Sequence, residues 1–165
     1  MESTSQALKA EAIRLGLCEK WTSEWVDGLT QQDLIDRFVK GYDFCVKHNF
    51  PDNDYVRNHF SRELLHKNNI YISEDVRLYN VVGNVILHGE CKGKIIETGA
   101  SAVVIYARHN THINVGVGDA SRVFLHLYDN ASAIVAQLMS GRVTVFLHGD
   151  GCKVEHKGNV KIIQK

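Results

Sequence analysis

The sequence predicts an α+β protein in which an N-terminal helical segment, residues 1–69, precedes a short β-solenoid, residues 70–165. Residues 81–160 divide into four rows of twenty that align without an insertion, and apolar residues alternate with other types along each row. Alternation with period two indicates strands, and the constant period of twenty indicates about four 20-residue coils of a structural repeat. An antiparallel β-sandwich is the alternative, which the constant period disfavours because hairpin loops vary in length.

The helical segment begins with a run that Ser3 or Ser5 can cap and that ends near Gly16. The next stretch contains Trp21 and Trp25, whose i, i+4 spacing predicts that they share one helical face. Each of these helices is short, so we expect it to depend on packing against the others.

Thr30 and Asp33 resemble a capping box with Asp in place of the usual Glu. They open the clearest helix, whose apolar stripe runs from Leu34 to Cys45. Pro51 interrupts the pattern, and a last helix is expected over about residues 54–65.

Three columns of the aligned rows are almost wholly aliphatic, and we expect them to form the core of the solenoid. They are Gly83-Val103-Val123-Val143, Val85-Ile105-Leu125-Val145 and Leu87-Ala107-Leu127-Leu147. The fourth row ends in the polar stretch 152–157, which we expect to be too polar to start another coil. Lys161 and Lys165 supply charge at the end of the stack, where it discourages pairing with another sheet edge.

Two further columns carry rings and a guanidinium group on the outward side of the first strand of each row. They read Ile86-Tyr106-His126-Phe146 and His88-Arg108-Tyr128-His148. Because Tyr, Phe and Arg are enriched at protein interfaces, this side is a candidate contact surface. Its predicted residues are Tyr106, Arg108, Phe124, His126, Tyr128, Phe146 and His148. The other interpretation is that this side packs beneath the chain's own helices.

No pattern in the sequence indicates catalysis or metal binding. The nine histidines include an H-x-x-H pair, His109 and His112, but in a turn and without the three or four convergent ligands that zinc requires. Nucleophile-elbow, phosphate-loop and H-E-x-x-H motifs are missing. We therefore expect no enzyme, no catalytic residue, no metal site and no cofactor. A histidine-based enzyme or metal-dependent binder on the solenoid face is the alternative, and glycan binding by exposed aromatic residues is a third.

The composition limits the classes of partner that we expect. Nineteen basic residues balance nineteen acidic ones, which argues against nucleic acid as a ligand. No apolar run reaches membrane-spanning length, and the first ten residues do not resemble a secretory signal. The four cysteines are isolated, as expected of reduced thiols in a cytoplasmic protein. We expect a protein partner or self-association, with no nucleic acid and no membrane.

Residues 11–18 with Trp21 and Trp25, residues 43–51, and the stretches 107–110 and 123–129 resemble a family of small proteins from gut bacteria and their phages. That family has no assigned activity, so the resemblance transfers no functional residue. The C-terminal half is also similar in style to bactofilins, which are polymer-forming β-solenoids, but its rows are longer than theirs and it carries a helical head.

The resemblance implies a phage or mobile-element origin. Together with the residue patterns it predicts a non-enzymatic structural, assembly or protein-binding module. We expect the protein in the cytoplasm, or in the virion if a phage encodes it.

Overall fold

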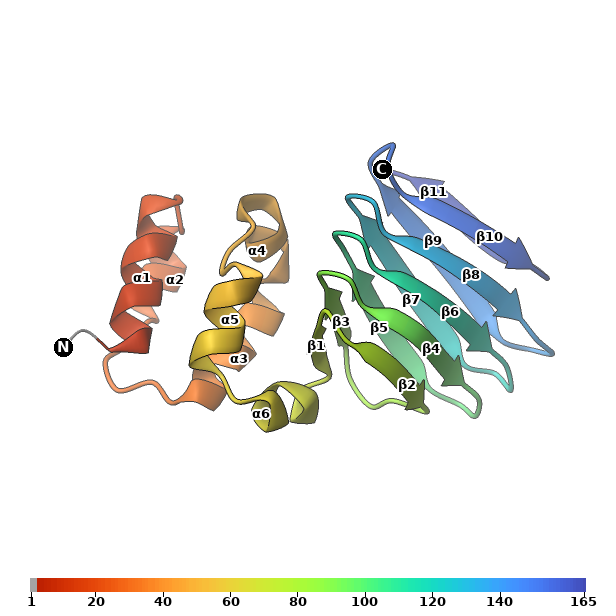
Figure 1. Cartoon of the computed structure of the whole chain (residues 1–165), viewed down its shortest axis with the longest axis horizontal. Coiled ribbons are helices and arrows are strands. Elements are labelled where there is room, and N and C mark those ends of the chain that lie inside the picture. Colours follow the sequence, from red (N-terminus) through yellow and green to blue (C-terminus); the bar gives the residue numbers. More distant parts are fainter. Residues whose placement is uncertain (1–2) are drawn as a thin grey trace. The chain divides into compact units, whose positions relative to one another are not determined.

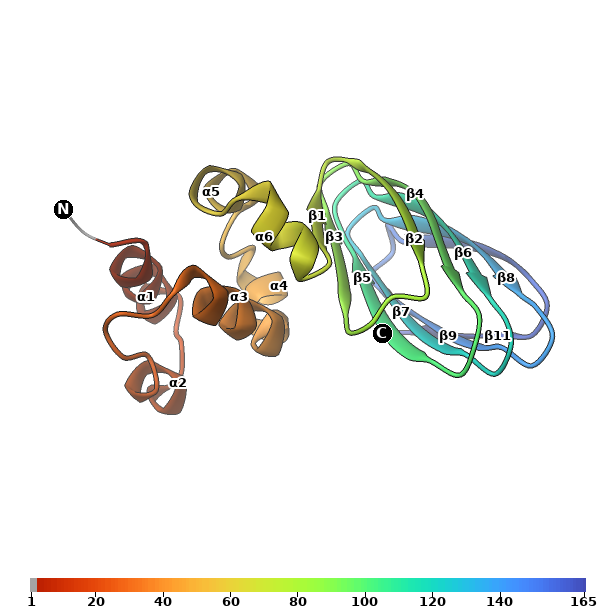
Figure 2. The same ribbon diagram turned by 90° about the horizontal axis from the view of Figure 1, so that it is seen from below.

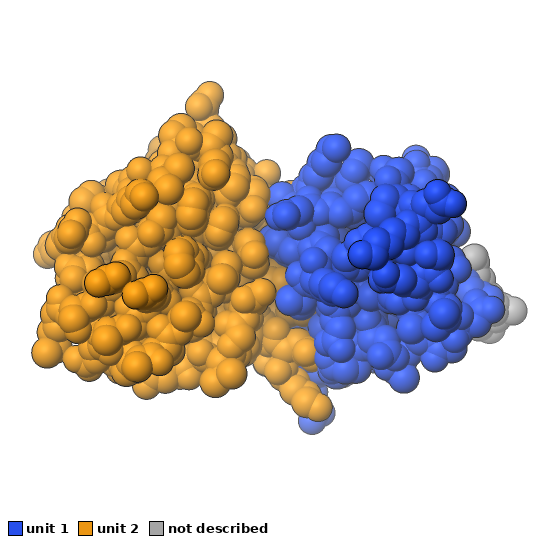
Figure 3. Space-filling model, turned by 180° about the vertical axis from the view of Figure 1, so that it is seen from behind, with its two compact units in different colours: residues 1–65 blue, residues 66–165 orange. Residues whose placement is uncertain are grey.

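The computed structural model describes residues 3–165. The chain forms two compact units: the first extends to Leu65 and the second runs from His66 to Lys165 (Figure 3). Each unit has its own buried side chains, and each is described here by itself.

The first unit is built of short helices. They are α1 (Thr4–Arg14), α2 (Glu19–Ser23), α3 (Gln31–Lys40), α4 (Tyr42–His48) and α5 (Asn53–His59), followed by α6 (Arg62–Lys67), which crosses into the second unit. The predicted caps are present. Ser3 and Gln6 form a capping box at α1, and Thr30 and Asp33 form another at α3. These side chains satisfy amide groups that have no partner inside the helix.

The prediction that Trp21 and Trp25 share a helical face is wrong, because α2 ends at Ser23. Trp25 lies after the helix and is buried, and its indole N–H donates to the Ser5 hydroxyl at 3.0 Å. Burial of the large indole with its donor satisfied therefore prevails over continuation of a five-residue helix.

Two of the predicted helices are each divided. The apolar stripe from Leu34 to Cys45 spans α3 and α4, which meet at Gly41 with φ −98° and ψ 26°. The last predicted helix becomes α5 and α6 because Phe60 adopts an extended backbone (φ −122°, ψ 136°). Phe60 is buried. Local periodicity continues through both breaks, so the sequence pattern alone does not mark them.

The second unit is a parallel β-solenoid, which confirms the predicted architecture and disfavours the antiparallel sandwich (Figures 1 and 2). Odd-numbered strands form a six-stranded sheet, here the first sheet, and even-numbered strands form a five-stranded second sheet. The first sheet contains β1 (Ile70–Ile72), β3 (Val85–His88), β5 (Ala102–Ala107), β7 (Arg122–Tyr128), β9 (Arg142–His148) and β11 (Val160–Gln164). The second contains β2 (Asp75–Tyr79), β4 (Lys92–Glu97), β6 (His112–Val117), β8 (Ser132–Gln137) and β10 (Lys153–Lys157).

The register follows the predicted period of twenty in the middle of the stack. Ile105 pairs with Leu125, and Leu125 pairs with Val145. The coils at the two ends are shorter, since Ile70 pairs with Ile86 and Val143 with Val160. The solenoid therefore has about five turns rather than four. The polar stretch 153–157 is β10, and β11 follows it, so the expectation that polarity stops the stack after the fourth row is wrong.

The predicted aliphatic columns form the first-sheet side of the core, except that Gly83 is exposed. The second sheet supplies the other side, including Ile95, Val115 and Val135. Val85, Ile105, Leu125 and Val145 are each 0% exposed and stack along one line between the sheets. One inward position is charged: Glu97 is fully buried and accepts hydrogen bonds from the Val81 amide at 2.9 Å and the Ser101 hydroxyl at 3.1 Å. These donors compensate the loss of water around a carboxyl group in the interior.

Among the described residues, no helix is both long enough and apolar enough to cross a membrane.

Gly93 is the glycine that the solenoid most clearly requires. Its φ is +142°, and a Cβ built there would lie 1.9 Å from the backbone oxygen of Val76 on the adjacent strand. The two strands pair through Val76 and Gly93, so neither can move without disturbing the ladder.

We predict that Gly93→Ala lowers the free energy of unfolding of the solenoid by about 3 kcal/mol or more, because overpacking adds to backbone strain. Urea unfolding followed by far-ultraviolet circular dichroism measures this. Gly99→Ala is the control: Gly99 has φ +105° but nothing within 4 Å of the added Cβ, so only about 1–2 kcal/mol of strain is expected. Equal losses in the two variants would contradict the prediction.

Candidate functional site

Five rings form a stacked cluster on the outward side of the first sheet. We call Tyr106, His126, Phe146, Tyr128 and His148 the ring ladder. The centroid distances are 5.1 Å between Tyr106 and His126, 4.4 Å between His126 and Phe146, and 4.2 Å between Tyr128 and His148. The rings of the last two pairs are nearly parallel, at 15° and 11°. The in-register pairing of β5, β7 and β9 therefore produces a continuous surface of rings.

The two columns of the ring ladder are joined by a hydrogen bond. The Nδ1 atom of His126 lies 2.9 Å from the Nε2 atom of His148. One nitrogen must carry the proton and the other must accept it, so the contact requires at least one neutral imidazole. This bond restrains two rings that stacking alone would allow to turn.

Two residues extend the ring ladder. Phe124 lies two residues before His126 on β7, so its side chain is on the same side of the sheet as the ring ladder. It is 38% exposed. The ammonium group of Lys165 lies 5.6 Å from the centre of the Phe146 ring, within the range of a cation–π interaction. Lys165 was not among the predicted site residues, because nothing in the sequence places the chain end beside β9.

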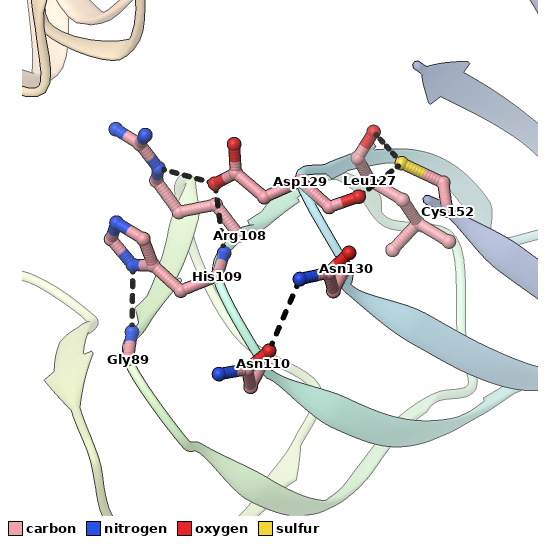
Figure 4. A network of polar contacts seen from close by, with 8 residues as sticks. All are labelled: Gly89, Arg108, His109, Asn110, Leu127, Asp129, Asn130 and Cys152. Carbon is pink, nitrogen blue, oxygen red and sulfur yellow. Dashed lines mark hydrogen bonds and ion pairs between the residues drawn. The ribbon is translucent and has the colours of Figure 1, made fainter. Parts of the chain in front are cut away.

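Arg108, the seventh predicted residue, lies in a polar network at a corner of the coil (Figure 4). It is buried, and its Nε donates to the Asp129 carboxylate at 3.1 Å. The same carboxylate oxygen accepts the His109 amide hydrogen at 3.0 Å. Burial by itself would raise the pKa of Asp129, but the His109 amide and the Arg108 guanidinium together lower it. Six of the seven predicted residues thus share the outward side of the first sheet, and Arg108 does not contribute its charge there.

Two histidines beside this network are held neutral. Burial, and then the charge of Arg108, lowers the pKa of His88 well below its usual value. Burial and Arg108 lower the pKa of His109 as well. The Nδ1 atom of His109 accepts the Gly89 amide hydrogen at 3.0 Å, which protonation at that nitrogen would prevent (Figure 4). These side chains stabilise the corner of the coil as acceptors and packing groups.

The H-x-x-H pair does not converge. His109 lies at the corner, whereas His112 is on β6 with its Nδ1 2.5 Å from the Ser132 hydroxyl. Within residues 3–165, no group of three or more His, Cys, Asp or Glu side chains is placed to hold a metal ion. The four cysteines are free; Cys91 and Cys152 are buried, their thiols donate to backbone carbonyls, and burial raises the pKa of both.

Sequence reasoning missed the outward side of the second sheet. Arg77, Lys92 and Lys94 line a groove there. The sequence carried one sign of this groove, because Lys92 and Lys94 are two residues apart and therefore share a side of their strand. Arg77 precedes the aligned rows, and its pairing with Lys94 results from a first coil shorter than twenty residues.

The chain matches no protein-family model, no curated protein and no solved structure in comparisons with known proteins.

We predict that the solenoid loses stability as the pH falls from about 8 to about 5. A histidine whose folded pKa is depressed binds its proton first in the unfolded chain, so stability is complete above about 6.5 and declines below it. Asp129 stays ionised over this range because its pKa is lowered.

The measurement is the free energy of unfolding at a series of pH values. In His109→Asn the amide oxygen can still accept the Gly89 hydrogen, but the titrating ring is gone. We expect this variant to lose less stability between pH 8 and 5 than the unmodified protein. An equal pH dependence in both proteins would show that His109 does not contribute.

Proposed function

We propose that the protein is a non-enzymatic binding or assembly module that contacts protein through the ring ladder and Phe124. The stacking of these rings on three consecutive strands carries the proposal. Rings already fixed in place lose little conformational freedom on binding, and large aromatic side chains supply much of the energy of protein interfaces.

A second copy of the chain is the partner that the ring ladder fits best. The ladder combines apolar ring faces with imidazole and hydroxyl groups that both donate and accept hydrogen bonds. Such a surface can be its own complement across a two-fold axis, where a ring of one copy meets a different ring of the other and the reverse contact repeats the pair. The rigid, paired strands beneath it would keep the surface flat enough to pack.

We also propose a phage or mobile-element origin, on the resemblance of residues 11–18, 43–51, 107–110 and 123–129 to small proteins of gut bacteria and their phages. A virion component would be one concrete form of an assembly module. The genes beside this one provide the test: capsid or tail genes would support the virion assignment, and a purely metabolic neighbourhood would contradict it.

A metal-dependent function is the second candidate, and one observation favours it. The facing nitrogens of His126 and His148 are 2.9 Å apart, and the two rings would bind one transition metal if they turned to bring both nitrogens to about 2 Å from it. A stable zinc site needs more ligands than two. Metal analysis of protein purified without a histidine tag distinguishes the two candidate functions. Stoichiometric zinc or nickel would favour the metal-dependent function over the binding or assembly module.

We predict that the purified protein self-associates in a concentration-dependent manner and that Tyr128→Ala with Phe146→Ala weakens association roughly tenfold or more, since truncated interface aromatics commonly cost more than about 1 kcal/mol each. Sedimentation velocity over a range of concentrations measures this.

Tyr79→Ala is the matched control. Tyr79 is 60% exposed on β2, in the second sheet, so its loss should leave self-association unchanged. A protein that stays monomeric at every concentration would overturn self-association through the ring ladder. So would a double variant that associates as strongly as the unmodified chain.

A further inference from the structure

The second sheet carries a groove on its outward side, away from the ring ladder. It crosses β2, β4, β6 and β8 and has a volume of about 560 Å³. Two outward columns border it: Lys92-His112-Ser132 and Arg77-Lys94-Asn114-Ile134. Between them lie the inward-facing positions Gly93, Ile113 and Ala133, whose backbone forms the floor.

The groove is positively charged. Arg77, Lys92 and Lys94 line it and are exposed, and no carboxylate side chain is among its lining residues. Within residues 3–165, no salt bridge engages any of these three cations. Adjacent strands place side chains about 4.8 Å apart, so the three charges converge on one region. The chain has no net charge, so this concentration of cations is a local property and not a consequence of composition.

Three of the remaining outward side chains in the two columns suit a ligand rich in hydroxyl groups, and the fourth, Ile134, is aliphatic and exposed. Asn114 offers both a donor and an acceptor. His112 and Ser132 are bonded to each other through the His112 Nδ1 atom, which leaves the His112 Nε2 atom and the second bond of the Ser132 hydroxyl for a ligand. Tyr79, at one end, is 60% exposed and presents a ring. The face of an aromatic ring is electron-rich and attracts the weakly positive C–H groups of a sugar ring.

Other anionic ligands fit the groove less well. An extended acidic peptide would need backbone partners, but the groove lies on the face of strands whose ladder hydrogen bonds are already made. A single-stranded nucleic acid would need a longer cationic track and several stacking rings. The cations that line the groove are confined to β2 and β4, and its rings are those of Tyr79 and His112. Beyond the groove, one column continues to Asp75 and Lys153 and the other to Glu155, so the positive charge does not continue as a track.

We infer that this groove binds an acidic oligosaccharide, with Arg77, Lys92 and Lys94 pairing with its carboxylates. Asn114, His112 and Ser132 would bind its hydroxyl groups. Because the groove and the ring ladder lie on different sheets, this inference and the proposed self-association can fail independently.

The test uses the full chain labelled with ¹⁵N and titrated with an oligogalacturonate, which carries one carboxylate on each sugar ring. A neutral malto-oligosaccharide of the same length is the control ligand. We expect amide shifts confined to β2, β4, β6 and β8 with the acidic sugar and none with the neutral one. Affinity should fall several-fold between about 0.05 and 0.5 M salt, because exposed charge pairs are screened.

The double variant Arg77→Ala with Lys94→Ala should lower the affinity for oligogalacturonate up to about thirtyfold, which corresponds to about 1 kcal/mol from each exposed charge. Arg122→Ala with Arg142→Ala is the matched control, since it removes two exposed arginines from paired strands of the first sheet. All four positions are exposed, so both variants should keep the melting temperature of the unmodified chain.

Several results would overturn the inference. The first is no binding of oligogalacturonate. Others are equal or tighter binding of the neutral sugar, of oligoglutamate or of single-stranded DNA. An equal loss of affinity in the two double variants would show that the groove does not hold the ligand.

Discussion

The parallel pairing of each residue with its equivalent one coil later is the constraint on which the solenoid depends. Through it Ile105, Leu125 and Val145 become neighbours although twenty residues of sequence separate each from the next. A strand that slipped by one residue would turn its whole aliphatic set outward. Burial of the aliphatic side chains therefore fixes the register as much as the hydrogen bonds between strands do. An additional residue in a coil has to form a bulge at a corner, because the strands cannot accommodate it without changing the register.

The same pairing makes both outward sides. Pairing in register brings rings together across β5, β7 and β9 of the first sheet, and it brings cations together on β2 and β4 of the second. Both surfaces consist of side chains on strands of several coils, so neither surface exists in a single coil. The paired strands keep the side chains of both surfaces in place. A scaffold of this kind presents side chains at a regular spacing on two sides.

The corners satisfy polar groups that the coil would otherwise leave buried without partners. Glu97 accepts from the Val81 amide and the Ser101 hydroxyl where the first coil meets the next. At another corner Asp129 accepts from Arg108 and from the His109 amide. A fully buried carboxyl group such as that of Glu97 would cost several kcal/mol without partners, and at the second corner the buried group that gains a partner is Arg108. These contacts link successive coils, so they support the same register that the aliphatic columns specify.

The sequence by itself determined the repeat, the aliphatic columns of the first sheet and the ring columns, because both periods can be read from the order of the side chains alone. It also determined the capping box at Thr30 and limited the first cap to Ser3 or Ser5, of which the structure uses Ser3. Only the tertiary structure decided the burial of Arg108, the position of Trp25 after α2 and the groove beside Arg77. Each of these depends on residues distant in sequence. Arg108 donates to Asp129 one coil away, Trp25 donates to Ser5 on α1, and Arg77 pairs with Lys94 because the first coil is shorter than twenty residues.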